Sequence, residues 1–134
     1  CCHHHLQAQL EQGDPPEPFG PVLAQGILKE RLGDILTDTF RVLLLRIMGY
    51  RADVVEFVSA VHTDKNLMIR AERVAGPGDD VAALHEYRAL RDYWDVRPHL
   101  EALLAVPLAA IDPDLPADEY PASGPAFCPV PGLG

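Results

Sequence analysis

A long amphipathic segment runs directly into a short, strongly apolar one, and this junction limits the fold more than any other feature. In residues 26–50, apolar side chains recur at spacings of three and four, while charged residues fill the opposite face. The apolar positions are Leu28, Leu32, Ile35, Leu36, Phe40, Leu43, Leu44 and Ile47. This spacing predicts a helix that ends in a left-handed turn at Gly49. Because "VLLLRIM" is apolar on more than one side, we expect this helix to pack against a sheet.

Two β-rich segments follow the helix. Residues 52–59 are rich in valine, and residues 65–74 alternate apolar and polar side chains. The short connection favours an antiparallel pair, but two strands alone do not make a stable sheet. Four apolar side chains would also need cover on both faces, as in the middle of an α/β sheet: Val54, Val55, Phe57 and Val58. The sequence therefore predicts an α/β fold with further strands that it does not contain. Together with the absence of an initiating Met, this leads us to expect part of a longer protein.

The remaining chain predicts three helices and a tail. Residues 1–12 are expected to be helical after the first few, and a Pro-rich loop follows at 13–21. Residues 79–94 predict a helix, with a shorter one at 97–106. The inward side chains of the 79–94 helix are expected to be Val81, Leu84, Tyr87, Leu90 and Trp94. Folded structure is predicted for 1–106, and the Pro-rich residues 107–134 are expected to form a disordered tail.

The composition favours a cytoplasmic protein of at most one domain. The chain has 134 residues and a net charge of −9, which disfavours a nucleic-acid partner because phosphate backbones would be repelled. Two adjacent cysteines and a distant third provide no disulfide framework, as is usual in a reducing compartment. No secretory signal is present, and no apolar run approaches the roughly 20 residues of a membrane span.

The first five residues, "CCHHH", have side chains that could bind a metal ion. Structural zinc sites use four cysteine or histidine ligands, usually two close pairs. Neighbouring side chains point in different directions, so at most two or three of these could reach one ion, and no second pair occurs at a suitable spacing. We therefore expect no metal site, and instead a segment with buried cysteines and with histidines that cap a helix or face solvent. A small interaction module stabilised by zinc through this cluster is the alternative.

A second polar group surrounds the predicted turn between the strands. It consists of Glu56, His62, Thr63, Lys65, Asn66 and Arg70. A histidine, a lysine and a glutamate together could carry out acid–base chemistry. A polar turn with a solvated lysine and an asparagine that holds the backbone explains the same residues more simply, and local pattern favours this interpretation.

Two blocks of the sequence resemble the C-terminal half of a class I S-adenosylmethionine-dependent methyltransferase. The blocks are "CCHHHLQAQL" and "FGPVLAQGILKERLGDILTDTFRVLLLRIMGYRADVVEFVSAVHTDKNLMIRA". They are similar to a group in which a P-C-C-H loop follows the fourth strand, then a G-I-L-x-E-R-x-x-D-x-x-T-D helix and an E-F-V-x-x-x-H-T-x-K-N-x-x-I-R strand pair. The resemblance covers residues 1–74. It implies a Rossmann-like sheet whose carboxyl ends hold the methyl donor.

The resemblance also implies roles for individual residues. The first loop would lie beside the donor's sulfonium and the methyl acceptor, with Cys1 and Cys2 against the donor and His3 or His4 as the base. The later turn would carry His62, Thr63, Lys65 and Asn66, either in contact with substrate or in a structural role. The acceptor itself is not identified.

The sequence also departs from this family. The Gly-rich donor loop, D-x-G-x-G, and the acidic residue that holds the donor's ribose do not occur in it. Both are expected upstream, in a missing N-terminal half of the domain. We therefore expect methyl transfer by the longer enzyme and no activity from this chain alone.

Overall fold

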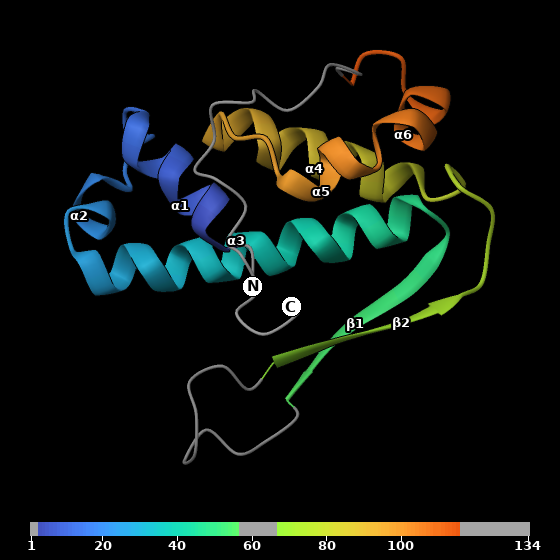
Figure 1. Cartoon of the computed structure of the whole chain (residues 1–134), viewed down its shortest axis with the longest axis horizontal. Helices are drawn as coiled ribbons and strands as arrows, with labels where there is room; N and C mark the ends of the chain where they lie inside the picture. The colour runs from blue at the N-terminus through green and yellow to red at the C-terminus, as the bar shows by residue number, and fades with distance from the viewer. Residues whose placement is uncertain (1–2, 57–66, 116–134) are drawn as a thin grey trace, which may run out of the picture.

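The computed structural model describes residues 3–56 and 67–115, which form six helices and two strands. The elements are α1 (His3–Gln12), α2 (Gly20–Leu23), α3 (Gly26–Ile47), β1 (Tyr50–Glu56), β2 (Leu67–Arg73), α4 (Val81–Trp94), α5 (His99–Leu103) and α6 (Ala105–Ile111). Figure 1 shows the long helix α3 across the middle of the molecule, with α1, α4 and α5 on one side and the hairpin β1–β2 on the other. The fold is therefore α/β in the broad sense.

The hairpin has the predicted antiparallel pairing. Val54 lies opposite Ile69, and Tyr50 lies opposite Arg73 at the end next to α3. Over the described ranges 3–56 and 67–115 the sheet has two strands, so the wider sheet expected from the sequence stays a prediction.

Gly49 connects the helical part to the hairpin, as its position after the apolar run predicts. Its φ is +91°, a backbone conformation that L side chains rarely adopt. Its carbonyl oxygen accepts hydrogen bonds from the backbone N–H groups of Val74 and Ala75, both at 3.0 Å. A Cβ atom here would lie 2.4 Å from the carbonyl oxygen of Ala75. Conformation and space therefore both require glycine at the point where the chain leaves α3.

The hydrophobic core lies on the helical side of α3. Phe40, Leu44 and Ile47 are almost completely buried there. The Phe40 ring meets the Tyr87 ring of α4 edge to face at 5.7 Å. Nearer the N-terminal end of α3, Gly33 allows α1 to approach, since a Cβ at Gly33 would lie 2.9 Å from Cγ of Gln7. The most buried side chains of α3 therefore contact helices. The expectation that α3 packs against a sheet holds only for the side of α3 that faces the hairpin.

Helix α4 begins at the predicted turn. The Asp80 side chain caps it by accepting a hydrogen bond from the Ala83 N–H at 2.9 Å, and this bond is the main cause that lowers the pKa of Asp80. Tyr87 and Trp94 are buried as predicted. The prediction for Val81 is wrong, because its side chain is 70% exposed in the first turn of the helix.

Packed structure continues past the predicted boundary at residue 106. Helix α6 extends to Ile111, and Leu108 and Leu115 are both buried in the core. Pro107 is compatible with this helix because it lies in the first turn, where its missing N–H is not needed. The expectation of a tail from residue 107 is therefore wrong for residues 107–115, while residues 116–134 lie outside the described part.

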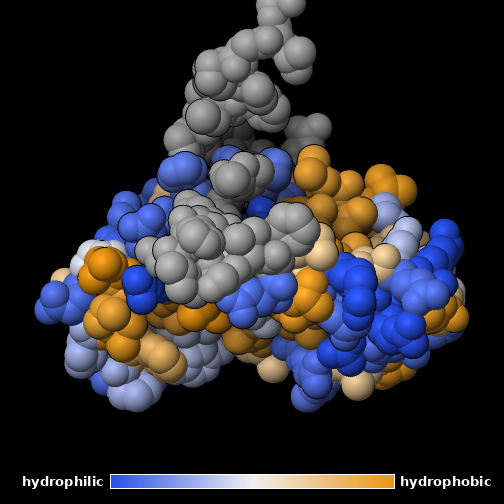
Figure 2. All heavy atoms as spheres, turned by 90° about the horizontal axis from the view of Figure 1, so that it is seen from below, coloured by the Kyte–Doolittle hydropathy of each residue, from blue (hydrophilic) through white to orange (hydrophobic). Residues whose placement is uncertain are grey.

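The hairpin presents apolar side chains to solvent on both of its faces. Val54 is 47% exposed, Leu67 56% and Met68 42%. Seen from the hairpin side, Figure 2 shows apolar groups separated by charged ones rather than one continuous patch. Within the described residues, no helix is long and apolar enough to cross a membrane.

Candidate functional site

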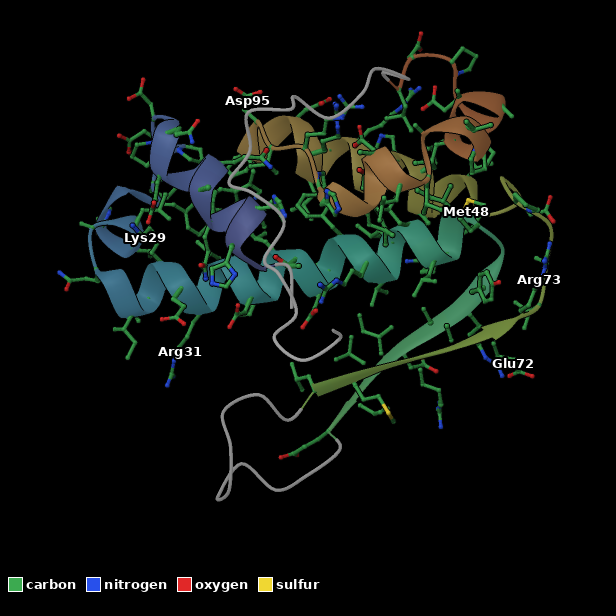
Figure 3. All side chains as sticks on the ribbon, viewed as in Figure 1. Lys29, Arg31, Met48, Glu72, Arg73 and Asp95 are labelled. Carbon is green, nitrogen blue, oxygen red and sulfur yellow. The ribbon has the colours of Figure 1, made fainter. Side chains whose placement is uncertain are left out.

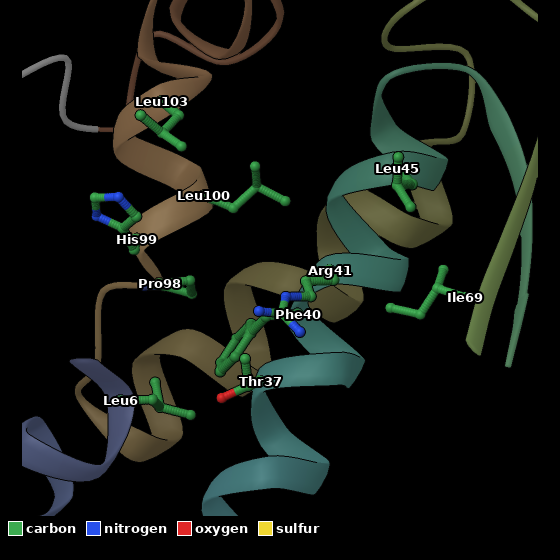
Figure 4. Close-up of a pocket in the computed structure, with 10 residues that line it drawn as sticks. All are labelled: Leu6, Thr37, Phe40, Arg41, Leu45, Ile69, Pro98, His99, Leu100 and Leu103. Carbon is green, nitrogen blue, oxygen red and sulfur yellow. The ribbon is translucent and has the colours of Figure 1, made fainter. Parts of the chain in front are cut away.

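An apolar pocket lies where α1, α3, α5 and β2 meet. Its volume is about 260 Å³. Figure 4 shows side chains entering it from all four elements. The apolar part of the lining comes from Leu6, Phe40, Leu45, Ile69, Pro98, Leu100 and Leu103. The remaining lining residues are Thr37, Arg41 and His99. Ile69 places this pocket between the helical part and the inner face of the hairpin.

The polar groups of the pocket come from two helices. On α3, the Thr37 hydroxyl donates a hydrogen bond of 2.7 Å to the Gly33 carbonyl oxygen. One turn later, Nη1 of Arg41 donates to Oδ1 of Asp38 at 2.8 Å. His99 lies at the start of α5, on the side that faces α1. The pocket therefore combines an apolar interior with hydrogen-bond donors, and none of its described lining residues is acidic.

His99 forms a stacked pair with His5 of α1. Their ring centroids are 4.7 Å apart and their planes differ by 9°. Burial lowers the pKa of His5, and the positive charge that His99 and His4 can carry lowers it further. The neutral form of His5 is therefore favoured where its ring stacks on His99, and His99 lines one end of the pocket.

A buried carboxylate holds α5 against α4. Glu101 is 1% exposed. It accepts hydrogen bonds from the Tyr87 hydroxyl, from Nε of Arg91 at 2.8 Å and from Nε of Arg97 at 3.1 Å. Burial, followed by the Glu101 charge, raises the pKa of Tyr87, so the phenol stays protonated and acts as a donor. These contacts fix the start of α5, where Pro98, His99 and Leu100 line the pocket.

Helix α1 is held to the same region through the main chain. The Gln9 amide nitrogen donates to the Arg97 carbonyl oxygen at 2.8 Å, and the Arg97 N–H donates back to Gln9 Oε1 at 2.6 Å. A single glutamine thus pairs with both backbone groups of Arg97, just before Pro98. This arrangement sets the separation of α1 and α5, and with it the contact between His5 and His99.

The structure describes only part of the predicted active site. Of the predicted residues, these lie outside the described ones: Cys1, Cys2, His62, Thr63, Lys65 and Asn66. His3 begins α1, and His4 follows it with an exposed side chain. Their predicted roles toward the donor, the acceptor and the proton stay predictions.

Metal binding has no support among the described residues. In residues 3–56 and 67–115, no three histidine, cysteine, aspartate or glutamate side chains lie close enough to hold an ion. The N-terminal cluster "CCHHH" falls largely outside this search.

Sequence reasoning missed the pocket residues Arg41 and His99. Arg41 follows Asp38 at helical spacing and lies next to the apolar stripe, which is a weak sign that it borders a cavity. The pairing of His99 with His5 has no local signal, because it joins helices from opposite ends of the described chain.

Comparison with known proteins assigns no family. No protein-family model matches the chain, and neither curated proteins nor solved structures give a match.

Proposed function

We propose that this chain is the C-terminal part of a class I S-adenosylmethionine-dependent methyltransferase. In this proposal β1 and β2 belong to a wider Rossmann-like sheet, whose remaining strands and donor site come from a preceding half of the domain. The proposed activity is methyl transfer to an acceptor that binds beside α1 and α5. The chain alone is inactive.

One observation carries the proposal: over residues 3–56 and 67–115 the sheet has two strands, and apolar side chains of both strands are exposed. Val54, Leu67 and Met68 are exposed on a two-stranded pair, an arrangement that is at most marginally stable in water. Further strands and helices would bury these side chains. The resemblance of residues 1–74 to the family supplies the identity of that larger sheet.

The apolar pocket does not have the lining expected of a site for the methyl donor. Its ribose hydroxyls are usually held by a carboxylate, and the pocket lining contains none. We therefore assign the pocket to the acceptor side, where an apolar wall aligns a substrate and excludes water.

A small binding module without activity is the second candidate. The pocket favours it, because a cavity of about 260 Å³ is formed by the described residues alone. Zinc held by the N-terminal cluster would stabilise such a module.

Isothermal titration with S-adenosylmethionine and with S-adenosylhomocysteine tests the first proposal. We expect no binding to the 134-residue chain and micromolar binding to a polypeptide extended upstream of Cys1 along its reading frame. Loss of the donor signal in that extended protein would contradict methyl transfer.

Circular dichroism with and without zinc separates the second candidate from the first. Helical content that rises on adding zinc to the 134-residue chain would support the module. Unchanged content, together with donor binding by the extended protein, would support the enzyme.

A further inference from the structure

The pocket has a charge character opposite to that of the chain around it. The whole sequence carries a net charge of −9, yet the ionisable side chains among the ten described lining residues are Arg41 and His99, both basic. The other eight are apolar or, in the case of Thr37, neutral. A site of this kind attracts an anion only if the rest of that molecule is apolar, because a bare inorganic anion would gain nothing from the leucine walls.

We propose that this pocket binds a small, largely apolar molecule that carries one carboxylate. The apolar body packs between Phe40, Ile69 and Leu100, and the carboxylate pairs with Arg41. His99 closes the end of the site that faces α1.

Arg41 can take this role while it keeps its present partner. A guanidinium has five N–H donors in a planar fork, and the hydrogen bond to Asp38 at 2.8 Å uses one of them. The Arg41–Asp38 pair is a partly exposed contact between neighbours on one helix, which is worth little free energy. A ligand carboxylate can therefore share the guanidinium or replace Asp38 at small cost.

The size of the pocket limits the ligand to about two fused rings. Pockets that take drug-sized molecules usually measure about 300–1,000 Å³, and this one measures about 260 Å³. Its wall contains the phenyl ring of Phe40, the imidazole of His99 and several branched aliphatic side chains. A flat bicyclic carboxylate has the required size and character. If the proposed methyl transfer holds, this is also the class of the methyl acceptor, and only that last assignment rests on the proposed function.

The test uses 2-naphthoate as probe and neutral 2-naphthamide as its uncharged analogue. Binding to the 134-residue chain is followed by isothermal titration and by NMR shifts of the Leu45, Ile69 and Leu100 methyl groups. We expect saturable 2-naphthoate binding with shifts at these methyls. The affinity for 2-naphthamide should be lower than that for 2-naphthoate by about tenfold or more.

Two variants and one control locate the contact. R41Q should lower the affinity for 2-naphthoate about tenfold and leave the affinity for 2-naphthamide unchanged. L103W, at the exposed mouth, should block both probes without touching the core. The control is R31Q, an exposed position on the same helix whose side chain points away from the pocket (Figure 3), and it should change neither affinity.

Several results would overturn the proposal. These are equal affinity for the two probes, an R31Q effect as large as that of R41Q, binding that L103W does not alter, and no saturable binding. Because no methyl donor is present, such a failure leaves the methyltransferase proposal standing. Conversely, an extended protein that binds no donor leaves the pocket assignment standing.

Discussion

The two sides of α3 differ in how completely their apolar side chains are buried. On the helical side, Phe40 and Leu44 are buried, and the charged groups nearest the core are hydrogen-bonded to one another. On the hairpin side, Val54 and Met68 remain exposed, and the ion pairs lie in solvent, as with Arg51 and Glu72 at 2.6 Å. The side chain of Glu72 extends from β2 away from the helices (Figure 3).

This difference shows where the chain's own contacts supply stability. Burial of apolar area contributes about 25 cal/mol per Å², so the helical side carries most of the free energy of folding. Exposed ion pairs contribute about 0–1 kcal/mol each, so the pairs across the hairpin cannot replace missing burial. The comparison predicts large effects of substitutions on one side of α3 and small effects on the other.

The largest effect is expected at the centre of the helical side. Phe40→Ala removes a ring that is 1% exposed and contacts Tyr87, and should lower the free energy of unfolding by about 3–5 kcal/mol. Urea denaturation followed by circular dichroism measures it. The matched control is Ile35→Ala, an exposed position on the same helix, which should cost less than about 1 kcal/mol. Equal costs would mean that the helices do not form the core described here.

A smaller loss is expected from the buried carboxylate. Glu101→Gln keeps the side-chain volume but removes the charge that pairs with Arg91 and Arg97, and should cost about 2–4 kcal/mol. Glu86→Gln is its control, because Glu86 pairs with Arg46 at 3.1 Å on the surface and should cost less than about 1 kcal/mol. Thermal unfolding of both variants gives the comparison. A Glu101→Gln variant as stable as the original chain would show that packing alone positions α5.

A substitution at Gly49, the junction between the two sides, should cause a loss of stability between those on either side. Gly49→Ala forces a side chain into a left-handed conformation and against the Ala75 carbonyl oxygen, at a cost of about 2 kcal/mol. Gly26→Ala, where an added Cβ meets nothing within 4 Å, is the control and should be close to neutral. Chemical denaturation measures both. Equal stability of the two variants would show that position 49 does not require glycine.

The smallest effect is expected in the hairpin. Val54→Thr replaces a half-exposed side chain by one of the same shape, and should change the stability of this chain by less than about 0.5 kcal/mol. Hydrogen exchange should also show faster exchange for β1 and β2 amides than for those of α3. In the upstream-extended polypeptide, the same substitution should cost more than about 1 kcal/mol if the strand becomes buried. An equally small effect there would argue against the wider sheet.

Local sequence pattern predicted the helices and strands better than it predicted the contacts between them. The three- and four-residue spacing within 26–47 identified α3, and Gly49 and Asp80 marked a helix end and a helix start. Alternation predicted the strand β2, and the short connection predicted its antiparallel pairing with β1. These features depend on neighbours in sequence, so a short window contains the information.

The errors come from contacts between distant segments. Val81 fits the apolar stripe of α4, but it lies in the first turn, beyond the residues that cover that face. Leu108 and Leu115 were assigned to a tail because proline-rich sequence suggests disorder, whereas the core offers these leucines a buried position. The contact between His5 and His99 depends on how α1 and α5 meet, which no local pattern encodes.

The paired hydrogen bonds between Gln9 and Arg97 have a consequence for how the protein is made. They join residues 88 positions apart, and a ribosome adds roughly 5–20 residues each second. Helix α1 therefore waits several seconds before Arg97 has been synthesised. Docking of α1 onto the start of α5 is for that reason a late event in the folding of this chain.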